Sequence, residues 1–166
     1  MDIHTFSRLF SAKMDEIKRF CASNDIKDVL GTEAVNHYKE SFANEGFTDE
    51  TLNPWKEVER RIPESEWYGH SGQTGKKSPA RTKAKILTGE TRELQNAITY
   101  KPIENGVRIT NDKPYAAVHQ FGKKAKIYGK KEFQMTARPF IGKSVLLVKN
   151  INDKIKREFI NILNRS

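Results

Sequence analysis

The sequence predicts an α+β fold in which helices near the two ends of the chain cover one face of an antiparallel β-sheet built from hairpins. Near both ends, apolar residues recur at steps of three or four, as on the buried stripe of an amphipathic helix. Between the helices, turn residues separate short runs of strand-forming residues. The chain of 166 residues has about the length of one domain, so residues 1–166 are expected to form a single domain.

Two helices are expected within residues 5–46. The first apolar stripe contains Phe6, Phe10, Met14, Ile17 and Cys21, and the second contains Ala34, Val35, Tyr38 and Phe42. The first stripe predicts a helix from Thr5 to Ala22. Asn24 or Asp25 is a suitable cap for the second helix, which Gly31 could divide. Its end is expected near Gly46, because glycine readily adopts the left-handed conformation that follows a helix.

Residues 47–85 are expected to form a long, extended and basic loop. They show no hydrophobic period and contain three prolines and three glycines. Loops of this length in a compact domain are usually functional or become ordered on a partner. Large rings at Trp55, Trp67 and Tyr68 normally need a surface to pack on, so part of the loop is expected to fold back on the core.

Residues 86–142 are expected to form a short helix and β-hairpins. The hydroxyl of Thr88 is suited to cap a helix that carries Leu94 and Ile98. In the run TYKPIENGVRITND, an Asn-Gly pair between two extended segments predicts a hairpin. The run IYGKKEFQM is a second hairpin candidate, with Gly129 at its turn and lysines at its tip.

The C-terminal helix is expected over residues 143–164. Its apolar stripe contains Val148, Ile151, Ile155, Phe159 and Ile162, while charged residues fall on the opposite side. This helix is expected to cover the sheet.

The formal net charge of +9 is unevenly distributed along the chain. Residues 2–50 hold six Lys and Arg residues against ten Asp and Glu residues, whereas the rest of the chain holds 24 against 11. Two runs without acidic residues are candidate contacts with a protein partner or DNA: Lys76, Lys77, Arg81, Lys83 and Lys85, and then Lys123, Lys124, Lys126, Lys130 and Lys131. Such runs suit loops near a polyanion, and equally suit solvated loops whose charge aids solubility.

The residues do not predict an enzyme, a metal site or a cofactor. Cys21 is the single cysteine, so an internal disulfide is excluded. The run GHSGQTGKKS fails as a phosphate loop, because the motif requires glycine where His70 stands and Ser or Thr where Lys77 stands. The four histidines are scattered, without metal-ligand spacing. No membrane span or signal peptide is predicted, so synthesis in the cytoplasm is expected.

His119 and Arg138 are better explained as structural residues than as catalytic ones. The neighbours of His119 are Val118 and Gln120, which supply neither a nucleophile nor a carboxylate. A histidine between an apolar strand and a loop is expected to hydrogen-bond backbone groups. Arg138 is expected either to hold loop carbonyls or a carboxylate, or to contact a partner subunit.

The order ILTGETREL, an Asn-Gly hairpin, YAAVHQFG, ARPFIGKS and a terminal helix resembles the phage virion morphogenesis family over residues 30–164. That family includes the Mu-like G tail protein and the tail completion proteins. Other anchors of the resemblance are Phe42, Leu87, Gly89, Leu94, Ala116 and Gly142, and its structural motif residues are Trp55, Tyr115, His119, Gln120, Gly122, Arg138, Pro139 and Phe140. Lys123–Lys131 and the segment with Trp67 and His70 look like insertions.

The resemblance implies a structural virion protein of a tailed phage or prophage, located in the tail or neck. It implies a role in tail completion or head-to-tail joining, by ring-like assembly with other copies of itself. Tail tube or neck proteins, and DNA in the channel, are the further expected partners. The alternative is a nucleic-acid-binding module that grips phosphates through the basic runs. A nuclease or peptidase is the least favoured class.

Overall fold

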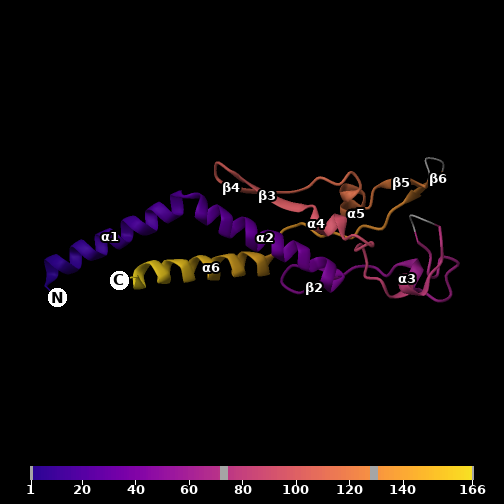
Figure 1. Cartoon of the computed structure of the whole chain (residues 1–166), viewed down its shortest axis with the longest axis horizontal. Coiled ribbons are helices and arrows are strands. Elements are labelled where there is room, and N and C mark those ends of the chain that lie inside the picture. The colour runs from indigo at the N-terminus through magenta and orange to yellow at the C-terminus, as the bar shows by residue number, and fades with distance from the viewer. Residues whose placement is uncertain (1, 72–74, 128–130, 166) are drawn as a thin grey trace.

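The computed structural model describes residues 2–71, 75–127 and 131–165, except the side chains of residues 127 and 131. Figure 1 shows an elongated molecule. Long helices and both chain ends occupy one end, and hairpins, short helices and irregular segments occupy the other. The α+β fold class predicted from the sequence is therefore confirmed, although its layers differ from the expected ones.

The first two helices are those predicted from the apolar stripes. Helix α1 spans Ile3–Ala22, and helix α2 spans Asn24–Asn44. The hydroxyl of Ser23 accepts a hydrogen bond from the amide of Asp25 at 3.1 Å. Ser23 is therefore the cap of α2, and the prediction of Asn24 or Asp25 is wrong. This one extended residue separates the two helices and gives the bend seen in Figure 1.

Helix α2 continues through Gly31 and ends one residue earlier than predicted. Gly31 does not divide the helix, and its missing side chain leaves room for the ring of Tyr100, which packs where a Cβ atom of any other residue would lie. Glu45, not Gly46, adopts the left-handed conformation, with φ of 52°. The carboxylate of Glu45 accepts a hydrogen bond from the amide of Ile86 at 2.6 Å, which helps to hold this unusual conformation.

The described residues form three separate two-stranded antiparallel hairpins instead of the single sheet that was expected. The strand pairs are β1 (Gly46–Thr48) with β2 (Leu52–Pro54), β3 (Ile98–Ile103) with β4 (Gly106–Asn111), and β5 (Lys124–Ile127) with β6 (Lys131–Gln134). Strands β3 and β4 pack against α2. Helical and irregular segments separate the hairpins along the chain, and their edges are not paired with one another.

Both predicted hairpins exist, with one change in register. Ile103 pairs with Gly106, so Glu104 and Asn105 form the turn of the β3–β4 hairpin. The predicted Asn-Gly turn is therefore shifted by one residue, and Gly106 begins a strand with φ of 151°. The turn predicted at Gly129 lies outside the described residues.

Helix α6 spans Val145–Asn164 and does not cover the β-structure. It packs against α1 and α2, and Figure 1 shows it on the side of α2 away from the β3–β4 hairpin. Leu147 and Ile162 are the buried residues of α6. The expectation that the C-terminal helix covers a sheet is wrong, because its apolar stripe is used on other helices and α2 forms the middle layer.

The segment 47–85 is more structured than the extended loop that was expected. It includes most of the β1–β2 hairpin, the 3₁₀ helix η1 (Glu59–Arg61) and the short helix α3 (Pro79–Lys83). Trp55 is only 8% exposed, so part of the segment folds back on the core as predicted from its large rings.

Two short helices lie in the following part of the chain, and neither is as predicted. Helix α4 is limited to Glu93–Asn96 and begins after Arg92, so Thr88 is not its cap. Ile98, which was expected on this helix, begins β3. Helix α5 (Ala116–Phe121) forms where an apolar strand was expected. Over such short runs, the helical period of 3.6 residues cannot be told apart reliably from the two-residue alternation of a strand.

The core lies where α2, the part of segment 47–85 around Trp55, and the residues before α6 meet. The ring centroids of Phe42 and Phe140 are 5.4 Å apart, and those of Phe42 and Trp55 are 5.6 Å apart. Phe42 and Phe140 are at most 1% exposed. The other buried core residues are Ala34, Tyr38, Ile86, Leu94, Ile98, Ala116 and Leu147.

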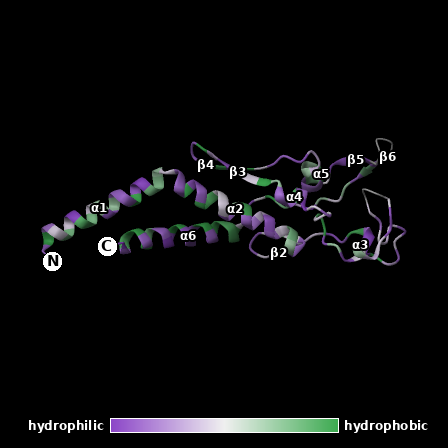
Figure 2. Cartoon of the chain, in the orientation of Figure 1, coloured by the Kyte–Doolittle hydropathy of each residue, from purple (hydrophilic) through white to green (hydrophobic). Residues whose placement is uncertain are grey.

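Helix α1 contributes no buried residue to this core. Its exposed apolar residues include Ile3, Phe6, Leu9 and Phe10. Figure 2 shows hydrophobic and hydrophilic residues alternating along α1 and α6. Within the described residues, none of the helices combines the length and the apolar character that a membrane span requires.

Candidate functional site

The two halves of the predicted structural motif meet where α5 contacts the segment that leads into α6. The side-chain oxygen of Gln120 accepts hydrogen bonds from the amides of Phe140 (2.9 Å) and Ile141 (3.1 Å), and its nitrogen donates to the carbonyl of Ile141 (2.6 Å). The amide of Arg138 donates to the carbonyl of His119 at 2.7 Å. The side chain of Gln120 and the main-chain contact between Arg138 and His119 therefore join residues that the β5–β6 hairpin separates in the sequence.

Trp55 and Arg138 attach the folded-back segment to the same place. The indole Nε1 of Trp55 donates to the carbonyl of Pro139 at 2.7 Å. The Nε and Nη2 atoms of Arg138 donate to the carbonyl of Lys56 at 3.1 and 3.0 Å, and Nη2 also donates to the carbonyl of Glu57 at 3.2 Å. The guanidinium group thus holds loop carbonyls, which was one of the alternatives expected for it.

Gly122 and Tyr115 bound helix α5. Gly122 adopts a left-handed conformation with φ of 62°, and a Cβ atom there would lie 2.8 Å from the nitrogen of Ala137. Glycine is therefore required both by conformation and by space. The ring of Tyr115 meets the ring of His119 edge-on at 6.1 Å, and its hydroxyl donates to Glu93 at 3.3 Å.

Three motif residues line a cavity of about 560 Å³ that also reaches α3, η1 and the start of α4. We call it the arginine cavity. Its lining includes three arginines (Arg60, Arg81 and Arg138), His119, three glutamates (Glu59, Glu90 and Glu93), and the residues Val58, Trp67, His70, Leu87, Leu94, Tyr115 and Met135. The three glutamates are exposed, whereas Arg138 is only 6% exposed. Positive charge therefore lies deeper than negative charge.

The imidazole of His119 lies in this cavity, where its surroundings favour the neutral form. Burial lowers its pKa, and the nearby positive charge of Arg138 lowers the pKa further. The expectation that its ring hydrogen-bonds the backbone is not met at Nδ1, which is buried and has no hydrogen-bond partner among the described residues. The carbonyl of His119, not its ring, makes the backbone contact to Arg138.

The arrangement is suited to binding an anionic group. Arg60 and Arg138 are both partly desolvated, and burial is the main cause that lowers the pKa of each. The positive charges of Arg81 and Arg61 lower the pKa of Arg60 further. Within the described parts of the chain, no group of three or more His, Cys, Asp or Glu residues is placed to hold a metal ion.

The first basic run is divided between the cavity and the surface. Arg81 lies on α3 and lines the cavity, whereas Lys76 and Lys83 are exposed. Lys77 donates to the carbonyl of Glu66 at 2.8 Å. The ammonium group of Lys85 donates to the carbonyl of Ala43, so this lysine links the segment before α4 to the end of α2.

The second basic run lies along the β5–β6 hairpin. Lys123 precedes β5 and lies 5.7 Å from the ring centroid of Phe121, and Lys124 begins the strand. These two lysines lie at the base of the hairpin, whereas the lysines expected at its tip are Lys130 and Lys131. Lys126 pairs with Glu132 at 3.6 Å. Lys130 lies outside the described residues, and Lys131 begins β6.

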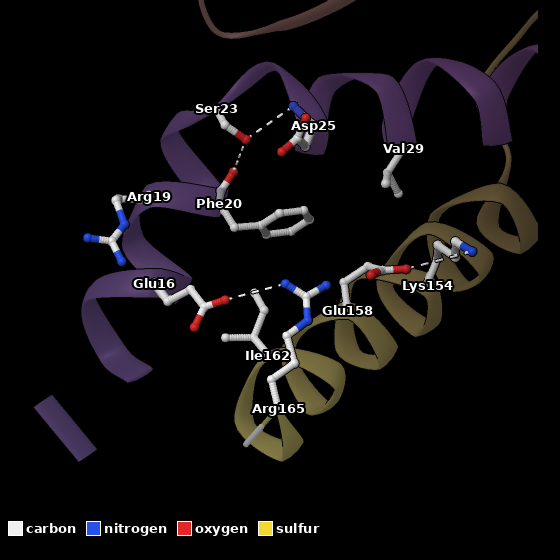
Figure 3. Close-up of a pocket in the computed structure, with 10 residues that line it drawn as sticks. All are labelled: Glu16, Arg19, Phe20, Ser23, Asp25, Val29, Lys154, Glu158, Ile162 and Arg165. Atoms are coloured by element: carbon white, nitrogen blue, oxygen red, sulfur yellow. Dashed lines mark hydrogen bonds and ion pairs between the residues drawn. The ribbon is translucent and has the colours of Figure 1, made fainter. Parts of the chain in front are cut away.

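A second cavity, of about 580 Å³, lies between α1, α2 and α6. Figure 3 shows Phe20 and Val29 facing α6, with Ile162 on the opposite side. An ion pair between Glu16 and Arg165 at 3.4 Å crosses from α1 to the end of the chain. None of the predicted site residues lines this cavity, so the arginine cavity is the stronger candidate.

Comparison with protein families gives a match to the phage virion morphogenesis family over residues 50–159. The chain belongs to this family. Membership gives it a structural role in a phage particle. The matched range begins later than the resemblance over residues 30–164, so Phe42 lies outside it, and both expected insertions lie inside it. Comparison with curated proteins and with solved structures gives no match.

All the residues that line the arginine cavity fall within the range matched to the family. Of the described lining of the second cavity, only Lys154 and Glu158 do so.

The sequence did not single out Arg60 as a site residue. In the structure its Nη2 atom donates to the carbonyls of Ala84 (2.8 Å) and Lys85 (2.9 Å). Its one signal is the Arg60-Arg61 pair in a stretch without periodicity, and such a pair is no guide to a cavity formed by distant segments.

Proposed function

We propose that this chain is a structural subunit that acts in tail completion or head-to-tail joining of a tailed phage or prophage, by ring-like assembly with copies of itself. The observation that carries the proposal is membership of the phage virion morphogenesis family over residues 50–159. The finer assignment to the Mu-like G tail proteins is part of the proposal. The proposed location is the tail or neck of the virion, with tail tube or neck proteins as partners.

The distribution of surfaces on the elongated molecule supports this role. Figure 1 places α1, which carries the exposed residues Ile3, Phe6, Leu9 and Phe10, toward one end, and α3 with the β5–β6 hairpin toward the other. A subunit of a closed ring needs two different contact surfaces, because each copy meets one neighbour on each side. We therefore assign the chain a structural role and no catalytic step.

Deletion of the gene in the phage tests the proposal. We expect unjoined heads and tails by electron microscopy, with joined particles restored when the gene is supplied in trans. Purified protein is expected to form closed rings in negative stain. Joined, infectious particles in the absence of the gene would show that the proposed role is wrong.

A second candidate is a nucleic-acid-binding module, favoured by the placement of both basic runs at one end of the molecule. Such binding would weaken steeply as salt is raised, because cations are released from the phosphate backbone on binding. A salt-titrated binding assay with duplex and single-stranded DNA separates the candidates. Little affinity at physiological salt is expected for the assembly subunit.

A further inference from the structure

Arg60, Arg81 and Arg138 line the arginine cavity together with three exposed glutamates, and the nearby carboxylate of Glu57 offsets part of the charge of Arg60 and Arg138. Arg60, Arg81 and Arg138 form no ion pair within 4.0 Å in the described ranges. Burying a positive charge is unfavourable unless an anion or several hydrogen bonds compensate it. Because Arg81 has neither an ion pair nor a side-chain hydrogen bond with a described residue, its guanidinium group is the part of the cavity that favours an anionic ligand.

The three arginines differ in what already holds them. Arg60 and Arg138 donate to main-chain carbonyls, which fix their positions but carry no full negative charge. The side chain of Arg81 has no hydrogen bond or ion pair with any described residue, and its Nε atom is buried. Arg81 is consequently free to reorient toward a ligand without breaking a contact that maintains the fold.

The surroundings restrict what kind of anion fits. The glutamates Glu59 and Glu90 are exposed at the rim, where they would repel the neighbouring phosphates of a nucleic acid backbone. Leu87, Trp67 and Met135 provide apolar surface beside the charged groups. A single carboxylate with apolar neighbours matches this combination better than a string of phosphates does.

We propose that the arginine cavity binds a carboxylate side chain presented by a protein segment of the assembling particle. This inference rests on the proposed function for the identity of the partner. A second copy of the chain is one source of the carboxylate, since residues 2–50 have an acidic excess and Asp25 and Glu40 on α2 are exposed. Another particle protein is the other source, and the same chemistry would apply to it.

A capped tripeptide provides a direct test in solution. The probes are acetyl-Leu-Glu-Leu-amide and acetyl-Leu-Gln-Leu-amide, which differ only in the charge of the middle side chain. Binding to the full chain is followed through the ¹⁵N-labelled Nε–Hε NMR signals of Arg60, Arg81 and Arg138. We expect saturable shifts with the glutamyl probe and none with the glutaminyl probe.

Arg81→Gln and Arg108→Gln form a matched pair of variants. Arg108 is exposed on β4 and lies outside the cavity. We expect Arg81→Gln to weaken binding of the glutamyl probe about tenfold, because one charge-assisted hydrogen bond is lost. Arg108→Gln should leave the affinity unchanged. Equal affinities of the two variants, equal shifts with both probes, or tighter binding of inorganic phosphate would overturn the proposal.

Sedimentation velocity then distinguishes the two sources of the carboxylate. If Arg81→Gln breaks up self-assemblies that Arg108→Gln retains, the ligand comes from a second copy. If self-assembly is unchanged while probe binding is lost, another particle protein supplies it. Normal particles after gene deletion would defeat the proposed function and leave the tripeptide result standing, so the two failures are distinguishable.

Discussion

Arg138 donates two hydrogen bonds to the main-chain carbonyl of Lys56, at 3.0 and 3.1 Å, across 82 positions of the sequence. This contact joins the folded-back segment to the residues that lead into α6. Because Arg138 is only 6% exposed, the contact is shielded from solvent. It also places one positive charge in the wall of the arginine cavity.

Replacing Arg138 by methionine is expected to destabilise the fold. The carbonyls of Lys56 and Glu57 would lose their charged donor, and each charge-assisted hydrogen bond contributes about 1.5–3 kcal/mol. We expect a loss of about 2–4 kcal/mol in the free energy of unfolding, measured by urea denaturation. Arg108→Met removes an exposed arginine and should change stability by less than about 0.5 kcal/mol. Similar losses in both variants would contradict the assigned role.

Gln120→Met should be more damaging than Gln95→Met. The first change removes one acceptor shared by the amides of Phe140 and Ile141, as well as the donor to Ile141, whereas Gln95 makes one hydrogen bond, to the carbonyl of Lys39. Unpaired buried amides cost about 1–3 kcal/mol each. Thermal unfolding followed by circular dichroism compares the two variants. A smaller effect at position 120 would show that other groups, such as water, replace the glutamine.

Gly31→Ala is expected to destabilise the fold although alanine favours helices. A Cβ atom at this position would overlap the ring of Tyr100, and overpacking of this kind costs about 1–3 kcal/mol. In the Tyr100→Ala background, the same change should become neutral or stabilising, by up to about 1 kcal/mol. A double-mutant cycle by urea denaturation measures this coupling. Additive effects would mean that the ring can move aside at little expense.

The free energy of unfolding is expected to decrease as the pH is lowered through the range where His119 titrates. Its pKa in the folded protein is lowered, chiefly by burial, so below the unfolded-state pKa of about 6.5 the unfolded chain binds more protons. Stability should therefore decrease as the pH falls from about 6.5 toward the folded-state pKa and then level off. The measurement is the urea midpoint as a function of pH.

His119→Gln should flatten that part of the profile, because the side chain no longer titrates. His4→Gln provides the control, since His4 is exposed on α1, far along the chain from the cavity. An unchanged slope in His119→Gln would assign the pH dependence to other groups.

The sequence was most informative where the signal is local and repeated. The apolar stripes of α1 and α6 extend over about four turns each, so their period of 3.6 residues is well determined, whereas the stripe of α2 covers only residues 34–42. The hairpin around Asn105 was also predictable, because turn residues and flanking strands are close in the sequence. Short elements such as α5 were mistaken, since six residues do not establish a period.

The sequence by itself determined the α+β class, the three long helices, the uneven charge and the family resemblance over most of the chain. Only the tertiary structure decided that the hairpins remain separate, that α6 packs on helices, and that Arg60, Arg81 and Arg138 line one cavity. These features depend on contacts such as those of Arg138 with Lys56, between segments that share no periodic pattern. Local propensity carries no information about which distant carbonyl a buried guanidinium group will meet.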